Sequence, residues 1–148
     1  MGSRAQEQEI DSLKTVIANT ADSVQIVALL KLCHLHLFTQ PDTALELATR
    51  AYDKCVFKDR EQEGIQVYKQ LMAEAANRIG TAHYLLGDFG NALIQWENFL
   101  RINMQRGDNR GIALAYGNMG IAYRLQGNLV ESLKSVMWAL KLDRNLLL

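Results

Sequence analysis

The sequence has little proline and few of the β-branched runs that form strands. Pro41 is the single proline in 148 residues, and valine, isoleucine and threonine do not cluster with a period of two. Alanine, leucine, glutamine, glutamate, lysine and arginine, which favour helices, dominate instead. The length suits one domain with a sizeable core. Together these features predict a single all-α domain.

The chain also lacks an excess of charge and a long apolar run. Sixteen basic residues balance sixteen acidic ones, so nucleic acid and other polyanions are not expected partners. No apolar run reaches about 18 residues, so we expect no direct membrane insertion of this sequence. No signal peptide is recognisable. We expect residues 1–5 to be a disordered expression scar and Leu146-Leu147-Leu148 to mark a fragment of a longer protein.

A repeat organises the C-terminal half of the chain. Gly-Ile-Ala-Tyr-Arg-Leu-Gln-Gly at 120–127 aligns with Gly-Thr-Ala-His-Tyr-Leu-Leu-Gly at 80–87, 40 residues earlier. Each copy predicts a helix, a turn and a second helix. The last glycine of each copy suits the left-handed end of the first helix, and the next residue suits an N-cap: Gly87-Asp88 and Gly127-Asn128.

Gly80 and Gly120 fall inside predicted helices, where glycine costs roughly 1 kcal/mol relative to alanine. Two antiparallel helices approach most closely where a side chain is absent. We therefore expect the partner helix to contact these glycines, with the small residues Ala92 and Ser132 facing them.

This pattern resembles the tetratricopeptide repeat, a helix–turn–helix unit usually about 34 residues long. The matching positions of the two copies are Ala76, Ile79-Gly80, His83, Gly87, Ala92, Trp96 and Phe99, and then Tyr116, Met119-Gly120, Tyr123, Gly127, Ser132, Val136 and Ala139. The longer spacing is similar to a variant with extended helices. The resemblance implies an all-α, right-handed superhelix of antiparallel helix pairs, with about seven helices.

A weaker copy precedes these two, with Leu29, Leu32-Cys33 and His36 in its first helix. We therefore divide the single domain, 6–148, into a leading helix 6–19, repeat one 22–56, repeat two 60–105 and repeat three 109–146. Ala44 and Ala92 are 48 residues apart rather than 40. The surplus lies in 57–72 and predicts one long helix over roughly 60–86, on the order of 40 Å in length.

The sequence contains no arrangement that indicates catalysis. Cys33 and His36 share a helix face, but His34 points elsewhere and no fourth ligand for a structural zinc ion is evident. A buried thiol is the simpler interpretation of Cys33. Neither a phosphate-binding loop nor a nucleophile elbow is present. We expect no enzyme, metal or cofactor.

In the family that this sequence resembles, the first helix of each unit lines a concave face that binds a protein or peptide. The positions carried over are Lys31, His34, Asn77, Arg78, Thr81, Tyr84, Asn118, Ile121 and Arg124. Some members clamp a peptide's terminal carboxylate. Arg78 and Asn118 match that clamp, but Leu30 and Gly117 replace its polar groups. We expect a mixed polar and apolar groove, and the alternative is that these side chains are simply solvated.

Two classes of function stay open. The segments 11–33, 43–55 and 107–128 are similar to repeat arrays at the N-terminus of bacterial sensor proteins that carry a histidine kinase or nucleotide cyclase domain. By that resemblance the chain is the sensory or scaffolding region of a signalling protein, in a periplasmic or extracytoplasmic location. The alternative is a stand-alone cytoplasmic adaptor or chaperone that binds a client in the same groove.

The C-terminal end predicts self-association. Trp138 and Leu146–Leu148 offer an apolar surface, whereas terminal repeats normally carry a polar outer face. We expect the chain to form a homodimer through this end or to use it in crystal contacts.

Overall fold

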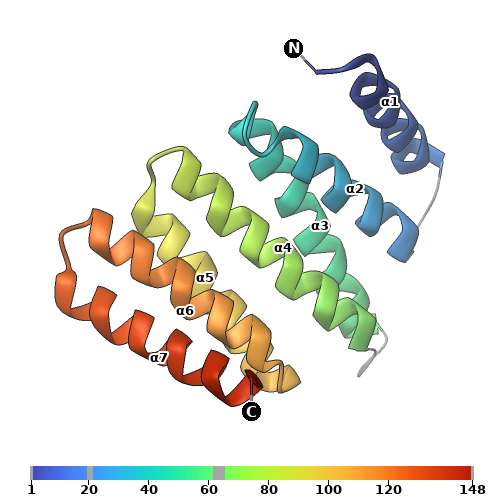
Figure 1. Ribbon diagram of the computed structural model, residues 1–148. Coiled ribbons are helices and arrows are strands. Elements are labelled where there is room, and N and C mark those ends of the chain that lie inside the picture. Colours follow the sequence, from blue (N-terminus) through green and yellow to red (C-terminus); the bar gives the residue numbers. More distant parts are fainter. Residues whose placement is uncertain (1, 20–21, 62–65, 148) are drawn as a thin grey trace.

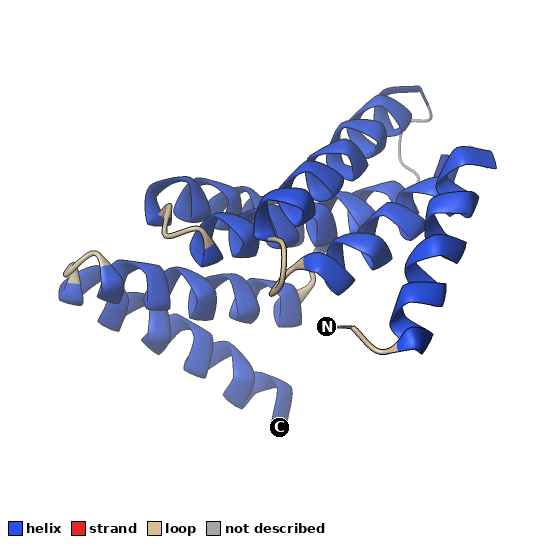
Figure 2. Ribbon diagram, turned by 90° about the horizontal axis from the view of Figure 1, so that it is seen from above, coloured by secondary structure: helices blue, strands red, loops and turns tan. Residues whose placement is uncertain are grey.

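Helices account for almost all of the regular structure. The computed structural model describes residues 2–19, 22–61 and 66–147, and within these ranges it contains seven helices and no strand. The helices are α1 (Arg4–Asn19), α2 (Asp22–His36), α3 (Pro41–Glu61), α4 (Gln66–Leu85), α5 (Phe89–Arg106), α6 (Asn109–Leu125) and α7 (Leu129–Leu147). They stack in chain order, and the stack curves when seen from above (Figures 1 and 2). The predicted all-α solenoid of helix pairs is confirmed.

The turns between paired helices have the predicted conformation. Gly87 and Gly127 both have a φ of 79°, in the left-handed region that favours glycine. The carboxylate of Asp88 accepts a hydrogen bond from the backbone N–H of Asn91 at 3.2 Å, which caps α5. Asn128 accepts from the N–H of Glu131 at 3.4 Å. These bonds satisfy N–H groups that the first turn of a helix leaves without partners.

The two glycines inside helices are points of close approach. A Cβ atom placed on Gly80 would lie 2.6 Å from the Trp96 indole, so Trp96 rather than Ala92 supplies the nearest atoms. A Cβ on Gly120 would lie 3.0 Å from a Val136 methyl group. The Ser132 hydroxyl donates to the Gly120 carbonyl at 2.8 Å. The glycines therefore allow α4 to pack closely on α5, and α6 on α7.

The core consists of two clusters that share α4. The first joins α2, α3 and α4, and α1 covers it with the partly buried Ile10, Leu13 and Ile17. The second joins α4, α5 and α6. Tyr52 and Met72 contact both clusters, so the two cores are continuous through α3 and α4.

Two of the predicted boundaries are wrong. The long helix predicted over 60–86 is not present as such, because residues 60 and 61 belong to the end of α3 and α4 occupies 66–85. Residues 62–65 lie outside the described ranges. The surplus residues lengthen both helices, and Tyr68 and Leu71 in the added turns of α4 are buried in the first core cluster. At the N-terminus, α1 already includes residues 4 and 5. The Ser3 hydroxyl accepts from the N–H of Gln6 at 3.3 Å, which caps α1.

Candidate partner-binding groove

The predicted groove residues lie on α2, α4 and α6, the first helices of the three repeats. Two hydrogen bonds between side chains connect these helices. Arg78 Nη1 of α4 lies 2.7 Å from His34 Nδ1 of α2. Asn118 Nδ2 of α6 donates to Asn77 Oδ1 of α4 at 3.0 Å. The structure therefore brings four of the nine predicted residues into one polar row that crosses three helices.

Arg78 is held in place on both sides. A guanidinium has only donors, so His34 Nδ1 accepts from it and carries no proton in this contact. Arg78 Nη2 also lies 3.5 Å from the Glu74 carboxylate, one turn earlier in α4. Because a guanidinium has five N–H donors, several stay available for a ligand. Because these two contacts already hold the Arg78 side chain, it loses little conformational entropy when it binds a carboxylate or a carbonyl.

The remaining predicted residues differ in their surroundings. The Thr81 hydroxyl donates to the Asn77 carbonyl within α4, at 2.9 Å. Tyr84 is partly buried and packs against the second core cluster, with the centre of its ring 5.9 Å from that of Trp96. Lys31 and Arg124 are exposed, and among the described residues neither forms an ion pair.

Exposed or partly exposed positions with the spacing i, i+4, i+7 and i+11 follow the groove helices and, for α2, continue into the turn after it. They are Val27, Lys31, His34 and Phe38 from the α2 region, Glu74, Arg78, Thr81 and Leu85 on α4, and Leu114, Asn118, Ile121 and Leu125 on α6. The last position of each set is apolar and exposed: Phe38, Leu85 and Leu125. We call these three residues the apolar band. The sequence prediction did not include them, although the same spacing would have identified them.

Gly117 on α6 leaves open space beside Asn118. A Cβ atom at Gly117 would have no other atom within 4 Å. Leu114 and Ile121, before and after it on the same face, are about half exposed. This part of α6 therefore exposes apolar side chains on either side of one amide side chain.

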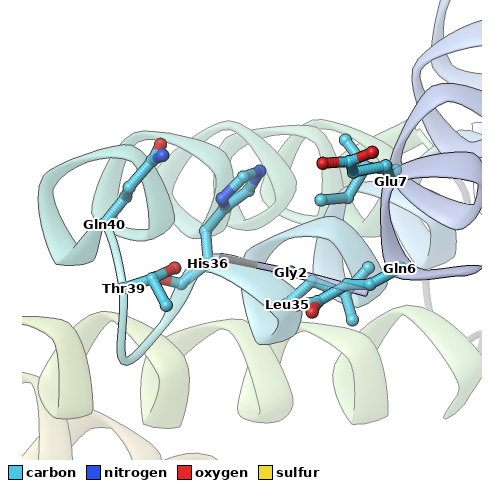
Figure 3. Close-up of a pocket in the computed structure, with 8 residues that line it drawn as sticks. Gly2, Gln6, Glu7, Leu35, His36, Thr39 and Gln40 are labelled. Atoms are coloured by element: carbon cyan, nitrogen blue, oxygen red, sulfur yellow. The ribbon is translucent and has the colours of Figure 1, made fainter. Parts of the chain in front are cut away.

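Open hollows of the surface lie elsewhere, and two of them are beside α1. A cleft of about 340 Å³ lies between α1 and the end of α2. Figure 3 shows the Glu7 side chain directed towards His36, with Gln6 beside Leu35. A second hollow of about 380 Å³ lies between α1, α2 and α3 and also includes His36. No residue of α1 is fully buried, so this helix packs loosely and leaves these hollows. None of the nine predicted groove residues lines either of them.

The thiols and the candidate metal ligands show no reactive arrangement. Cys33 and Cys55 are free and buried. Burial raises the pKa of Cys33 to about 11 and that of Cys55 to about 12, so both thiols are protonated and weakly nucleophilic at neutral pH. In the part of the chain that the structure describes, no three His, Cys, Asp or Glu residues are placed to hold a metal ion together. None of the described helices combines the length and apolarity that spanning a membrane requires.

Comparison with solved structures gives matches that cover most of the chain. The tetratricopeptide repeat domain of Arabidopsis FLU covers 94% of the chain with a TM-score of 0.66 and 19% identity, and 98% of that domain is covered. The structure of MamA covers 98% of the chain with a TM-score of 0.45 and 18% identity, and 98% of its own chain is covered. No curated protein sequence matches this chain.

A sequence model of one family matches residues 71–145, about half of the chain, and its description is tetratricopeptide repeat. The matched region contains the two repeats with in-helix glycines, the left-handed turns at Gly87 and Gly127, and the packing residues between them. The chain belongs to the tetratricopeptide repeat family.

Proposed function

We propose that the chain is a protein–protein interaction module that binds an extended peptide segment of its partner across α2, α4 and α6. The observation that supports this most strongly is the polar row from His34 through Arg78 and Asn77 to Asn118, beside the apolar band. Membership of a family that forms interaction scaffolds supports the same class of function.

The groove has the chemistry that a peptide requires. The amides of Asn77 and Asn118 and the guanidinium of Arg78 offer donors and acceptors to a peptide backbone. Lys31, Arg78 and Arg124 bring positive charge, and Glu74 is the acidic residue among the exposed positions of the groove helices. A segment with an acidic residue next to an apolar one therefore fits best, with its apolar side chain on the apolar band.

A peptide-display selection against the purified chain tests this proposal. We expect selected peptides to combine acidic and apolar residues and to compete with one another for one site. In a fluorescence anisotropy assay, Arg78→Glu should weaken binding by roughly 10- to 100-fold, because a hydrogen bond to a charged group contributes about 1.5–3 kcal/mol. Arg101→Glu makes the same change of charge on α5, where Arg101 bonds Asn98 of its own helix, and should leave binding unchanged.

Two results would contradict the groove as the binding surface. One is equal binding by the Arg78→Glu variant and the wild-type chain. The other is a selection that yields peptides insensitive to both Arg78→Glu and Ile121→Asp, since Ile121 is an exposed apolar residue of α6.

We further propose that this module is the sensory or scaffolding region of a larger bacterial signalling protein, based on the similarity of segments 11–33, 43–55 and 107–128 to sensor arrays. The alternative is a stand-alone cytoplasmic adaptor or chaperone. Sequencing the complete gene separates the two proposals. A downstream membrane helix and a kinase or cyclase domain would support the first, whereas an early stop codon would contradict it.

A further inference from the structure

The hollow of about 380 Å³ between α1, α2 and α3 is lined by both apolar and charged side chains. Leu32 and Leu47, which are almost buried, and Ile17, which is partly buried, supply its apolar part. Small-molecule sites have volumes of roughly 300–1,000 Å³ and combine apolar surface with a few convergent polar groups. This space, which we call the α1–α3 hollow, therefore has the size and composition of a ligand site.

Three charged side chains line the hollow, and they come from two different helices. Lys14 lies on α1, whereas Glu46 and Arg50 lie on α3. All three are exposed, and in the described part of the chain every ion pair involves other residues. Two positive charges and one negative charge are therefore available to a molecule in the hollow.

The two charges on α3 stay apart although their spacing favours an ion pair. On a helix, a glutamate four residues before an arginine is in the favourable order, and the two Cβ atoms lie about 5–6 Å apart. Glu74 and Arg78 have this spacing on α4, and their side chains are 3.5 Å apart. Glu46 and Arg50 have the same spacing on α3, but within the described ranges they form no ion pair. These two side chains can therefore bind opposite charges of a third molecule, one helical turn apart.

We propose that the α1–α3 hollow binds a free amino acid with an apolar side chain. The Arg50 guanidinium donates two hydrogen bonds to the α-carboxylate, whose geometry a planar guanidinium matches. The Lys14 ammonium adds a second positive charge beside that carboxylate. The Glu46 carboxylate accepts hydrogen bonds from the α-ammonium group, and the apolar side chain of the ligand covers Leu32 and Leu47.

The charges of the hollow favour a zwitterion over a simple anion or cation. A phosphate or a simple carboxylate would pair with Lys14 and Arg50 but would bring a second negative charge next to Glu46. A simple amine would pair with Glu46 and be repelled by the two cations. Gln40 and Thr43 add hydrogen-bonding groups without charge, and the Thr43 hydroxyl donates to Gln40 Oε1 at 3.4 Å. An amino acid therefore satisfies all three charged groups of the hollow at once.

Such a ligand also holds α1 against the rest of the stack. α1 has no buried residue and contacts the first core cluster through the partly buried Ile10, Leu13 and Ile17. A molecule bound by Lys14 of α1 and Arg50 of α3 connects these two helices directly. Because a ligand stabilises the state that binds it, local opening of α1 becomes less frequent.

Isothermal titration calorimetry of the full chain with leucine, methionine and phenylalanine tests the proposal. We expect at least one of them to bind at a single site, with a dissociation constant below about 1 mM. The N-acetyl derivative of the amino acid that binds lacks the ammonium group, and its amide lacks the carboxylate. Each derivative should bind at least roughly 10-fold more weakly than the free amino acid, because one hydrogen-bonded charge is missing.

Substitutions on α3 test whether the hollow is the site. Arg50→Gln and Glu46→Gln should each weaken binding by roughly 10-fold or more, because each removes one charged partner of the ligand. Arg101→Gln and Glu97→Gln remove the same charges from exposed positions of α5 and should leave binding unchanged. Hydrogen exchange of the α1 amides should slow when the amino acid is added to the wild-type chain, and should not slow in the Arg50→Gln variant.

The amino-acid site is separate from the peptide groove, because none of the predicted groove residues lines the hollow. Arg78→Glu should therefore leave amino-acid binding unchanged, so that the two proposals can fail independently. No binding of any of the three amino acids at about 10 mM would overturn the proposal. Equal binding of the N-acetyl derivative, or equal binding by the Arg50→Gln variant, would overturn it as well.

Discussion

The substitution Gly80→Ala tests the close approach of α4 and α5. A new Cβ atom would lie 2.6 Å from the Trp96 indole, roughly 1 Å inside ordinary van der Waals contact. Trp96 is 3% exposed, so the ring has no free space to move into. Overpacking of this kind typically costs about 1–3 kcal/mol, while the better helix propensity of alanine returns roughly 1 kcal/mol. Because the overlap is severe, we expect a net loss of stability of about 1–2 kcal/mol.

Gly117→Ala is the matched control, because a Cβ atom there meets no other atom within 4 Å. This variant should gain roughly 0.5–1 kcal/mol from helix propensity and from the reduced freedom of the unfolded chain. Urea unfolding followed by far-ultraviolet circular dichroism measures both effects. If Gly80→Ala unfolds at the same urea concentration as Gly117→Ala, or at a higher one, the explanation of Gly80 as a packing residue is refuted.

Three further predictions concern capping, burial and a hydrogen bond. The hydrogen bonds from Asn91 lower the pKa of the Asp88 carboxyl below its usual value of 3.8. The ionised carboxylate therefore stabilises the folded chain above pH 3.8, and this stabilisation decreases as the pH falls below that value. Asp88→Ala should remove this part of the pH dependence of stability, as measured in acid titrations followed by circular dichroism. Cys33 and Cys55 should react slowly with iodoacetamide at pH about 8 and rapidly in urea; rapid modification of the folded chain, detected by mass spectrometry, would contradict their burial. Ser132→Ala removes the hydrogen bond to the Gly120 carbonyl and should destabilise the chain by about 1 kcal/mol in urea unfolding, and an unchanged midpoint would mean that this bond contributes nothing.

The repeat, its turns and its in-helix glycines were predictable from the sequence because they depend on local spacing. A residue such as Gly87 has a left-handed conformation whatever the neighbouring repeat does. The boundary between α3 and α4 was not predictable in the same way. The stretch 57–72 contains no proline and a single glycine, Gly64, so its helix propensity gives no clear stop. Burial of Tyr68 and Leu71 against the first core determines where α4 packs, and burial depends on tertiary structure.

The groove was predictable only at the level of helix faces. The family pattern placed Lys31, Asn77 and Asn118 on the first helices, where the structure also has them. It did not predict the contact between His34 and Arg78, because that contact depends on the distance between α2 and α4. The packing of the Tyr84 ring towards Trp96 was not predicted for a related reason, since it depends on how α4 and α5 pack.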